Sequence, residues 1–266
     1  LPDPEAPTMA TDSWPPRSKL ISWRIVSSPV VSATRLVMRW TEMMGSGMDR
    51  SAGSRWRRRD WLAHCILAAV AVPAVGIAQP ALRKVLIVGD SLSAEYGLPR
   101  GSGWVALLEQ RIAREKLPAL VVNASISGDT TAGGRARLPA LLKTHSPAVV
   151  VIELGGNDAL RGLPLASTRD NLLAMVRAAK AAGARVLVVG MQVPPNYGRK
   201  YGEDFIALFA EVARQEGTSL APFLLEGVAN APDADALFQP DRIHPKSQAH
   251  PRMLENVWVV LKPMLR

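Results

Sequence analysis

Runs of consecutive apolar residues recur at regular intervals in the chain after residue 80. Four such runs, rich in Val, Ile and Leu, cover residues 85–88, 120–122, 148–152 and 186–189, and a weaker run covers 219–221. Strands that are apolar on both faces are typical of a parallel sheet with helices on each side. The pattern therefore predicts five parallel strands buried between two layers of helices.

The segments between these runs carry apolar residues at helical spacing. Helices are expected over residues 104–115, 135–143, 167–182 and 203–215, with a last one over 254–261. Alternating strands and helices predict an α/β fold, here a three-layer α/β/α, doubly wound domain with a five-stranded parallel sheet. In such domains ligands bind beyond the C-terminal ends of the strands.

The first 47 residues show a different pattern. They lack sustained helical or strand periodicity and begin with Leu, and five of the seven Trp residues of the chain occur before residue 80. This composition is typical of translated upstream sequence. We predict that residues 1–47 are an extension outside any domain and that the biological start is Met48, or else Met43 or Met44. A genuine disordered extension is the alternative.

Residues 48–78 have the order of a secretory signal peptide. A basic segment over residues 50–59 precedes an apolar run over 61–78 that ends in Gly76-Ile77-Ala78. Cleavage after Ala78 would leave a mature domain over residues 79–266, periplasmic or secreted and without stable membrane insertion. An uncleaved anchor is the alternative, but Pro73 and Gly76 interrupt a run of barely sufficient length.

Charge and cysteine content exclude several classes of protein. The net charge is +9, but the basic residues after residue 80 are scattered, so no nucleic-acid partner is expected. The single cysteine, Cys65, excludes a disulfide framework and a cysteine-based metal site. The chain has no Walker motif, and the turn after the first strand lacks Gly-x-Gly-x-x-Gly, which disfavours nucleotide binding.

Groups that could carry chemistry follow the first three predicted strands. Ser91 follows the first strand, Gly128 the second and Asn157 the third, while Asp241 and His244 precede the last helix. The C-terminal ends of parallel strands lie at one edge of the sheet, where ligands bind. These segments can therefore converge on one site.

Ser91, His244 and Asp241 have the residue types of a catalytic triad. A serine hydroxyl is a poor nucleophile until a base removes its proton. His244 can be that base, and on a helical turn Asp241, three residues before it, would face the same way and orient the ring. A helix cap at Ser91 and an incidental ion pair at Asp241 and His244 are the alternatives.

Acyl transfer also needs hydrogen-bond donors for the oxyanion. The backbone N–H groups of Ser91 and Gly128 and the side-chain amide of Asn157 are the candidates. A turn glycine and an Asn-Asp turn are the alternatives for Gly128 and Asn157.

These blocks, in this order, resemble the SGNH (GDSL) hydrolases. The blocks are Gly89-Asp90-Ser91-Leu92, Gly128, Gly155-Gly156-Asn157-Asp158 and Asp241-x-x-His244. Residues 123–130, 136–142, 153–158 and 195–198 are similar to the bacterial periplasmic branch that comprises acyl-CoA thioesterase I, lysophospholipase L1 and arylesterase. The resemblance covers about residues 84–265.

The resemblance implies a flavodoxin-like fold without a metal or cofactor. It implies Ser91 as nucleophile, Asp241 and His244 as the other triad members, and Gly128 and Asn157 as oxyanion donors. It also implies a mobile substrate-lining loop after Asn157, formed by Ala159, Leu160, Arg161, Gly162, Leu163 and Pro164. One departure is His250, where this branch often has Gln, and it affects only the start of the last helix.

The implied activity is hydrolysis of small-molecule carboxylic esters and thioesters whose acyl chain lies in a shallow apolar groove. A carbohydrate acetyl-esterase of the same family and a non-catalytic lipid- or acyl-binding periplasmic protein are the alternatives. An α/β-hydrolase is disfavoured, because its Gly-x-Ser-x-Gly motif needs glycine where this chain has Ser93.

Overall fold

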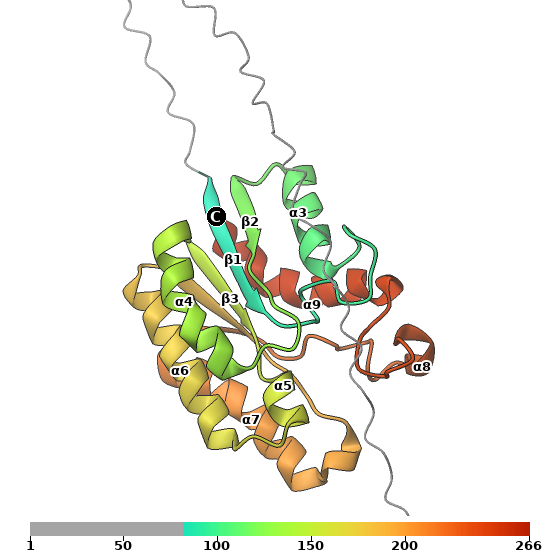
Figure 1. Cartoon of the computed structure of the whole chain (residues 1–266). Helices are drawn as coiled ribbons and strands as arrows, with labels where there is room; N and C mark the ends of the chain where they lie inside the picture. Colours follow the sequence, from blue (N-terminus) through green and yellow to red (C-terminus); the bar gives the residue numbers. More distant parts are fainter. Residues whose placement is uncertain (1–81) are drawn as a thin grey trace, which may run out of the picture. The chain divides into compact units, whose positions relative to one another are not determined.

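The structure, a computed structural model, describes residues 82–266. They contain one five-stranded sheet in the order β2-β1-β3-β4-β5, and every neighbouring pair is parallel. Figure 1 shows this sheet between helices. The strands are β1 (Arg83–Gly89), β2 (Ala119–Asn123), β3 (Val149–Glu153), β4 (Arg185–Val189) and β5 (Ser219–Ala221). The predicted α/β fold and its parallel sheet are confirmed.

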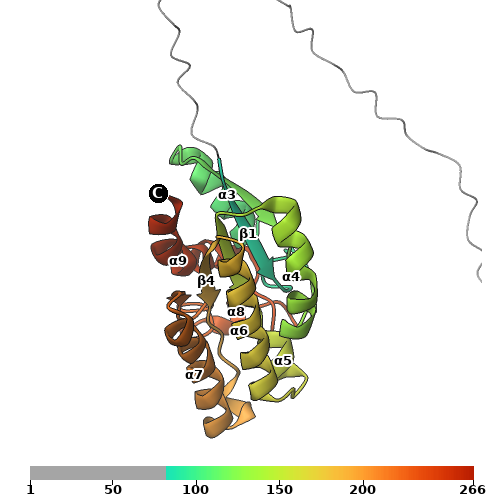
Figure 2. The same ribbon diagram turned by 90° about the vertical axis from the view of Figure 1, so that its left-hand side faces the viewer.

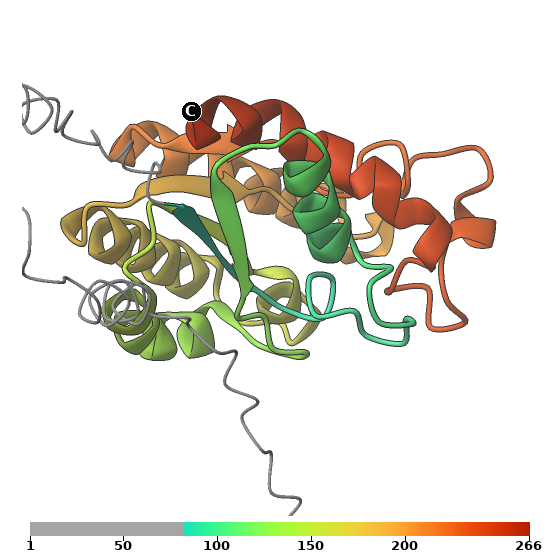
Figure 3. The same ribbon diagram turned by 90° about the horizontal axis from the view of Figure 1, so that it is seen from above.

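Helices cover both faces of the sheet. The longer ones are α3 (Trp104–Arg114), α4 (Thr131–His145), α6 (Leu165–Ala181), α7 (Arg199–Glu216) and α9 (His250–Leu261), and the short ones are α5 (Gly156–Leu160) and α8 (Ala234–Leu237). Helices α3 and α9 pack side by side, as the view from above shows (Figure 3). On the other face α6 lies between α4 and α7 (Figure 2). The three predicted layers are therefore present.

The strand order places the ends of β1, β2 and β3 next to one another. Strand β1 lies between β2 and β3, so the chain changes direction across the sheet at this point. Ligands of doubly wound sheets bind in the crevice beyond the strands where the strand order reverses. Gly89 at the end of β1 is the Cα partner of Glu153 at the end of β3. The segments that follow these strands therefore start side by side.

The core lies mainly around the three central strands. The side chains of β1, β3 and β4 are buried over most of their length, whereas β2 is half-buried and its Leu120 is 42% exposed. Strand β2 is at the edge of the sheet and has a neighbour on one side only. The prediction of burial on both faces is thus wrong for β2, because an apolar run does not reveal the position of its strand.

Three helices begin four residues earlier than the apolar spacing predicts. Helix α4 begins at Thr131 rather than residue 135, and the Thr130 hydroxyl caps it by accepting from the Gly133 backbone N–H. Gly134 lies so close to Leu154 that a Cβ there would be 2.2 Å from the leucine Cδ1. Helices α7 and α9 likewise begin at residues 199 and 250, before the expected 203 and 254. Gly133 and Gly134 make the start of α4 hard to recognise in the sequence, because glycine is a poor helix former. The close approach of Leu154 nevertheless requires a glycine at position 134.

The predicted extension over residues 1–47, the predicted signal peptide over 48–78 and Cys65 lie outside the described residues. Within residues 82–266, no helix is long and apolar enough to cross a membrane.

Candidate active site

Ser91 lies on an irregular turn that follows β1. Residues 91–97 form successive turns, and the next helix begins only at Trp104. Asp90 shapes the first turn, because its Oδ1 accepts from the Leu92 backbone N–H at 3.0 Å. Because no helix begins at this turn, the alternative of a helix cap at Ser91 is wrong. The half-buried hydroxyl is left for another partner.

That partner is His244. The Ser91 Oγ lies 2.8 Å from His244 Nε2, and Asp241 Oδ2 lies 2.7 Å from His244 Nδ1. An ionised carboxylate only accepts, so Nδ1 carries the proton and Nε2 is free to accept from the serine hydroxyl. The three side chains form a continuous hydrogen-bonded chain that can transfer the serine proton.

Asp241 and His244 come together through a side-chain turn rather than a helical one. Asp241 Oδ1 accepts from the backbone N–H groups of Ile243 at 2.9 Å and of His244 at 3.0 Å. Arg242 between them has a φ of 58°, in the left-handed region that a helical turn does not visit. The predicted pairing is present, but the predicted helical geometry is wrong because Asp241 binds the backbone ahead of it.

The charge state of Asp241 follows from these contacts. Burial acts to raise its pKa, but the backbone N–H and the ring of His244, together with the Ile243 N–H, outweigh burial and lower the pKa to about 2. The carboxylate is therefore ionised at neutral pH and favours a protonated Nδ1. The Tyr96 ring packs 4.3 Å from the His244 ring, centroid to centroid, and limits its rotation.

Three hydrogen-bond donors lie on the segments that follow β1, β2 and β3. Within residues 82–266, neither the Ser91 nor the Gly128 backbone N–H has a hydrogen-bond partner. Gly128 has a φ of 78°, which only glycine adopts readily. The Asn157 amide uses one N–H on Asp90 Oδ2, at 3.0 Å, and keeps a second. The Ile126 N–H also donates to Gly89 O at 3.0 Å, which ties the Gly128 loop to the end of β1.

The expected substrate-lining segment is partly helical. Ala159 and Leu160 belong to α5, and Ala159 is 1% exposed in the core, so its side chain does not face a ligand. Leu160 and Leu163 are 42% and 37% exposed. Arg161 donates from Nη2 to Gly128 O at 2.7 Å. The family resemblance implied a loop here, but its first two residues belong to α5, and Ala159 is corrected to a core residue.

Sequence reasoning missed the buried carboxyl of Asp158. Its Oδ2 accepts from the Thr131 backbone N–H at 2.9 Å, and its Oδ1 accepts from the hydroxyls of Thr131 and Thr168. These bonds fix α5 against the start of α4 and α6, and so fix the backbone that carries Asn157. An aspartate directly after a candidate oxyanion residue was the available signal.

Sequence reasoning also missed two buried carboxyls beneath the triad. Glu153 is fully buried. Its Oε2 accepts from the Ser93 hydroxyl at 2.6 Å and from the Asp90 N–H at 3.3 Å. Its Oε1 has no partner within the described residues. Burial, and then the negative charge of Asp90, raise the pKa of Glu153 well above its usual value. Burial also raises the pKa of Asp90, to about 6. A charged residue at the end of an apolar run was the available signal for Glu153.

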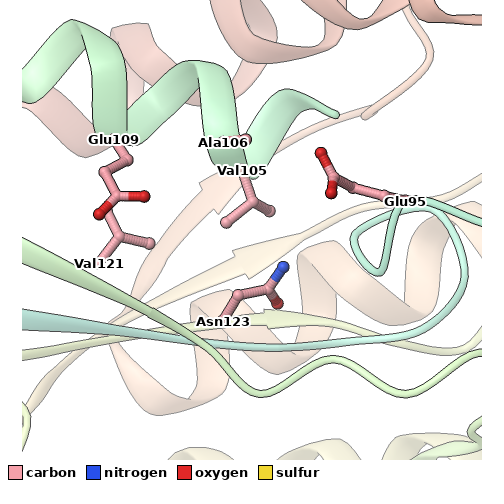
Figure 4. Close-up of a pocket in the computed structure, with 6 residues that line it drawn as sticks. All are labelled: Glu95, Val105, Ala106, Glu109, Val121 and Asn123. Carbon is pink, nitrogen blue, oxygen red and sulfur yellow. The ribbon is translucent and has the colours of Figure 1, made fainter. Parts of the chain in front are cut away.

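A pocket lies beside α3. Figure 4 shows its lining residues, which are Glu95, Val105, Ala106, Glu109, Val121 and Asn123. The Glu95 carboxylate already accepts from the backbone N–H groups of Gly101 and Gly103. No triad residue lines this pocket. In the described part of the chain, no group of three or more His, Cys, Asp or Glu side chains is placed to hold a metal ion.

Comparison with known proteins identifies the same family as the sequence blocks. Residues 87–252 match the GDSL-like lipase/acylhydrolase family. Esterase TesA of Pseudomonas aeruginosa is 55% identical over 187 residues, which are 70% of this chain and 92% of the relative. Thioesterase 1/protease 1/lysophospholipase L1 of Escherichia coli strain K12 is 42% identical over 181 residues, or 68% of this chain and 84% of the relative.

A solved structure has the same architecture. The crystal structure of TesA matches with a TM-score of 0.66 and 55% identity, and the match covers 68% of this chain and 99% of that chain. The family resemblance of the four blocks is therefore confirmed.

Proposed function

The chain belongs to the GDSL-like lipase/acylhydrolase family and is a serine esterase, and we propose that it works through an acyl-enzyme on Ser91. The observation that carries this proposal is the continuous chain from Ser91 Oγ through His244 to Asp241, with contacts of 2.8 and 2.7 Å. This arrangement has the donor and acceptor roles of a serine nucleophile with its base and orienting acid.

The first step is attack of Ser91 Oγ on the substrate carbonyl carbon. His244 Nε2 takes the hydroxyl proton, and Asp241 stabilises the resulting imidazolium. The carbonyl oxygen becomes an oxyanion that accepts from the Ser91 N–H, the Gly128 N–H and the free N–H of Asn157. When the tetrahedral intermediate collapses, the bond to the leaving alcohol or thiol breaks and His244 returns the proton to it.

The second step hydrolyses the acyl-enzyme. His244 Nε2 removes a proton from a water molecule, whose oxygen attacks the acyl carbon while the same three donors hold the oxyanion. The bond to Ser91 Oγ then breaks, and the serine regains its proton from His244. No step calls on a metal or cofactor.

We propose carboxylic esters and thioesters, including aryl esters, acyl-CoA and lysophospholipids, as substrates. Support comes from the relatives, which are named as an esterase and as a thioesterase and lysophospholipase. Each segment near the triad also exposes an apolar side chain that can border an acyl chain: Tyr96, Ile126, Leu160, Leu163 and Ile243. These side chains are the proposed edge of a shallow acyl groove.

The proposed mature enzyme comprises residues 79–266 and is periplasmic or secreted, with residues 48–78 removed as a signal peptide and residues 1–47 outside the domain. Its proposed partners are small acyl substrates and not nucleic acids. Mass spectrometry of the protein from fractionated cells would test this. A mature N-terminus at Gln79 supports the proposal, and a cytosolic chain that retains residues 48–78 contradicts it.

Labelling with a fluorophosphonate probe tests the proposed nucleophile. The wild type is expected to be labelled on Ser91, whereas Ser91→Ala should give neither label nor turnover of p-nitrophenyl esters, acyl-CoA or a lysophospholipid. Ser167→Ala, at an exposed serine of α6, is the matched control and should behave as wild type. Near-normal turnover by Ser91→Ala would exclude the mechanism.

A further inference from the structure

One buried carboxylate connects the nucleophile turn to the proposed oxyanion amide. Asp90 is 2% exposed; its Oδ1 accepts from the Leu92 N–H and its Oδ2 from Asn157 Nδ2, each at 3.0 Å. Leu92 follows Ser91 directly, while Asn157 lies 67 residues from Asp90 in the sequence. A single side chain therefore contacts both the turn that carries Ser91 and the amide of Asn157.

The orientation of a side-chain amide depends on its hydrogen-bond partners. The oxygen and nitrogen of an asparagine amide have nearly the same shape, so packing alone does not choose between the two orientations. An ionised carboxylate only accepts and must face the NH2 group. If the Asn157 amide were turned over, its oxygen would face the Asp90 carboxylate and a carbonyl oxygen would replace the donor.

We propose that Asp90 is a positioning residue that selects the donor orientation of the Asn157 amide. The carboxylate binds one N–H of the amide and leaves the second for the oxyanion. This inference rests on the proposed role of Ser91, Gly128 and Asn157. It explains why the Asn157 amide presents an N–H, and not its oxygen, to the oxyanion.

The surroundings of Asp90 favour its ionised form, which selection of the amide orientation requires. Asp90 has two N–H donors, whereas Oε1 of the neighbouring Glu153 has no partner within residues 82–266 and the carboxyl is fully buried. Of this pair, Asp90 therefore holds the charge and Glu153 the proton. Burial raises the pKa of Asp90 to about 6, Asp129 adds to the rise, and the Leu92 and Asn157 bonds and His244 oppose it.

Asp90→Asn tests the proposal with little change in shape. An asparagine accepts from the N–H two residues ahead as well as an aspartate does, so the turn at Leu92 is kept. The new NH2 group then faces Asn157 and favours the reversed amide. We expect kcat to fall about 100-fold, the size of the loss of one oxyanion donor, with KM changed less than twofold.

A double-mutant cycle separates positioning from general damage to the fold. In an Asn157→Ala background there is no amide to orient, so Asp90→Asn should lower kcat less than threefold. His250→Gln is the matched control, since His250 is likewise buried but binds the Trp104 backbone N–H at the start of α3. Whatever effect His250→Gln has should be the same in both backgrounds.

A second measurement needs no substitution at Asp90. The ratio of kcat between the wild type and Asn157→Ala should fall as the pH falls through about 6, because a protonated Asp90 no longer selects the amide orientation. Both enzymes contain the same triad, so the ratio reports the contribution of the Asn157 amide.

The inference would be overturned by equal losses from Asp90→Asn in both backgrounds, or by a ratio that does not change between pH 5 and 8. Activity in Ser91→Ala would instead overturn the proposed function. An inactive Ser91→Ala together with a fully active Asp90→Asn would overturn this inference alone.

Discussion

Gly89 and Glu153 are direct Cα partners in β1 and β3, and a Cβ on Gly89 would lie 2.7 Å from Glu153 Oε2. The same Cβ would lie 2.8 Å from the Ser93 Cβ and Oγ. The glycine therefore lets the buried carboxyl and the Ser93 hydroxyl meet directly beneath the turn that carries Ser91. Glycine is needed here for this close approach and not for a left-handed backbone conformation, since the φ of Gly89 is not in the left-handed region.

Gly89→Ala should accordingly destabilise the protein and reduce its activity. Overpacking a rigid site costs about 1–3 kcal/mol, and relief requires a shift of the Ser91 turn. Denaturant unfolding and esterase assays would measure both effects. Gly202→Ala is the matched control, because its Cβ would meet only Val193 at 3.7 Å within α7, and it should be neutral or stabilising by up to about 1 kcal/mol. Equal effects of the two substitutions would contradict this reading.

Asp241→Asn should lower kcat by roughly 10³- to 10⁴-fold with little loss of stability. The amide can still accept from the Ile243 and His244 N–H groups, but its NH2 group can face Nδ1 and favour the wrong tautomer of His244. Steady-state kinetics with a p-nitrophenyl ester would measure the loss. Asp235→Asn on α8 provides the control and should keep full activity. A loss below tenfold in Asp241→Asn would argue against the orienting role.

Glu153→Gln should become more stable relative to wild type as the pH rises. The pKa of Glu153 is raised in the folded state, so the stability that its proton contributes is complete below pH 4.5 and is lost as the pH rises through the folded pKa. A glutamine does not titrate and avoids this loss. Urea unfolding of both proteins at pH 5 and pH 8 would measure it. A stability difference that is the same at both pH values would contradict the assignment of a buried, protonated Glu153.

His250→Gln should show the opposite dependence on pH. His250 is 1% exposed, its Nδ1 accepts from the Trp104 backbone N–H at 3.0 Å, and burial lowers its pKa. The unfolded chain then binds the proton more tightly, so wild-type stability falls as the pH falls from about 6.5 through the folded pKa. The free energy of unfolding of the variant, relative to wild type, should be higher at pH 5 than at pH 8. A higher relative stability at pH 8 would contradict a buried, neutral His250.

Leu160→Ser together with Leu163→Ser should weaken the preference for long acyl chains. Both side chains are well exposed near Asn157, so the substitutions remove apolar contact area while the fold is kept. A loss of about 1–3 kcal/mol in kcat/KM is expected for long-chain esters and little for acetate esters. A series of p-nitrophenyl esters would measure the loss, with Leu82→Ser, at an exposed residue outside the site, as control. An equal loss for all chain lengths would contradict the proposed groove.

The sequence predicted the sheet and the segments of the site because both depend on local pattern. Apolar runs marked all five strands, and the segments that follow three of them contained Ser91, Gly128 and Asn157. Helix starts were predicted less well. The start of α4 depends on a Thr130 cap and on glycines that suit packing rather than helix formation. The departure at His250 leaves α9 intact, since that helix begins at this residue.

By itself the sequence determined the α/β fold, the order of the blocks that identify the family and the pairing of Asp241 with His244. Only the tertiary structure decided which buried groups meet beneath Ser91. The bonds from Asn157 to Asp90 and from Ser93 to Glu153 join segments 60 or more residues apart. Such contacts depend on the register in which β1 and β3 pair, and no local pattern specifies that register.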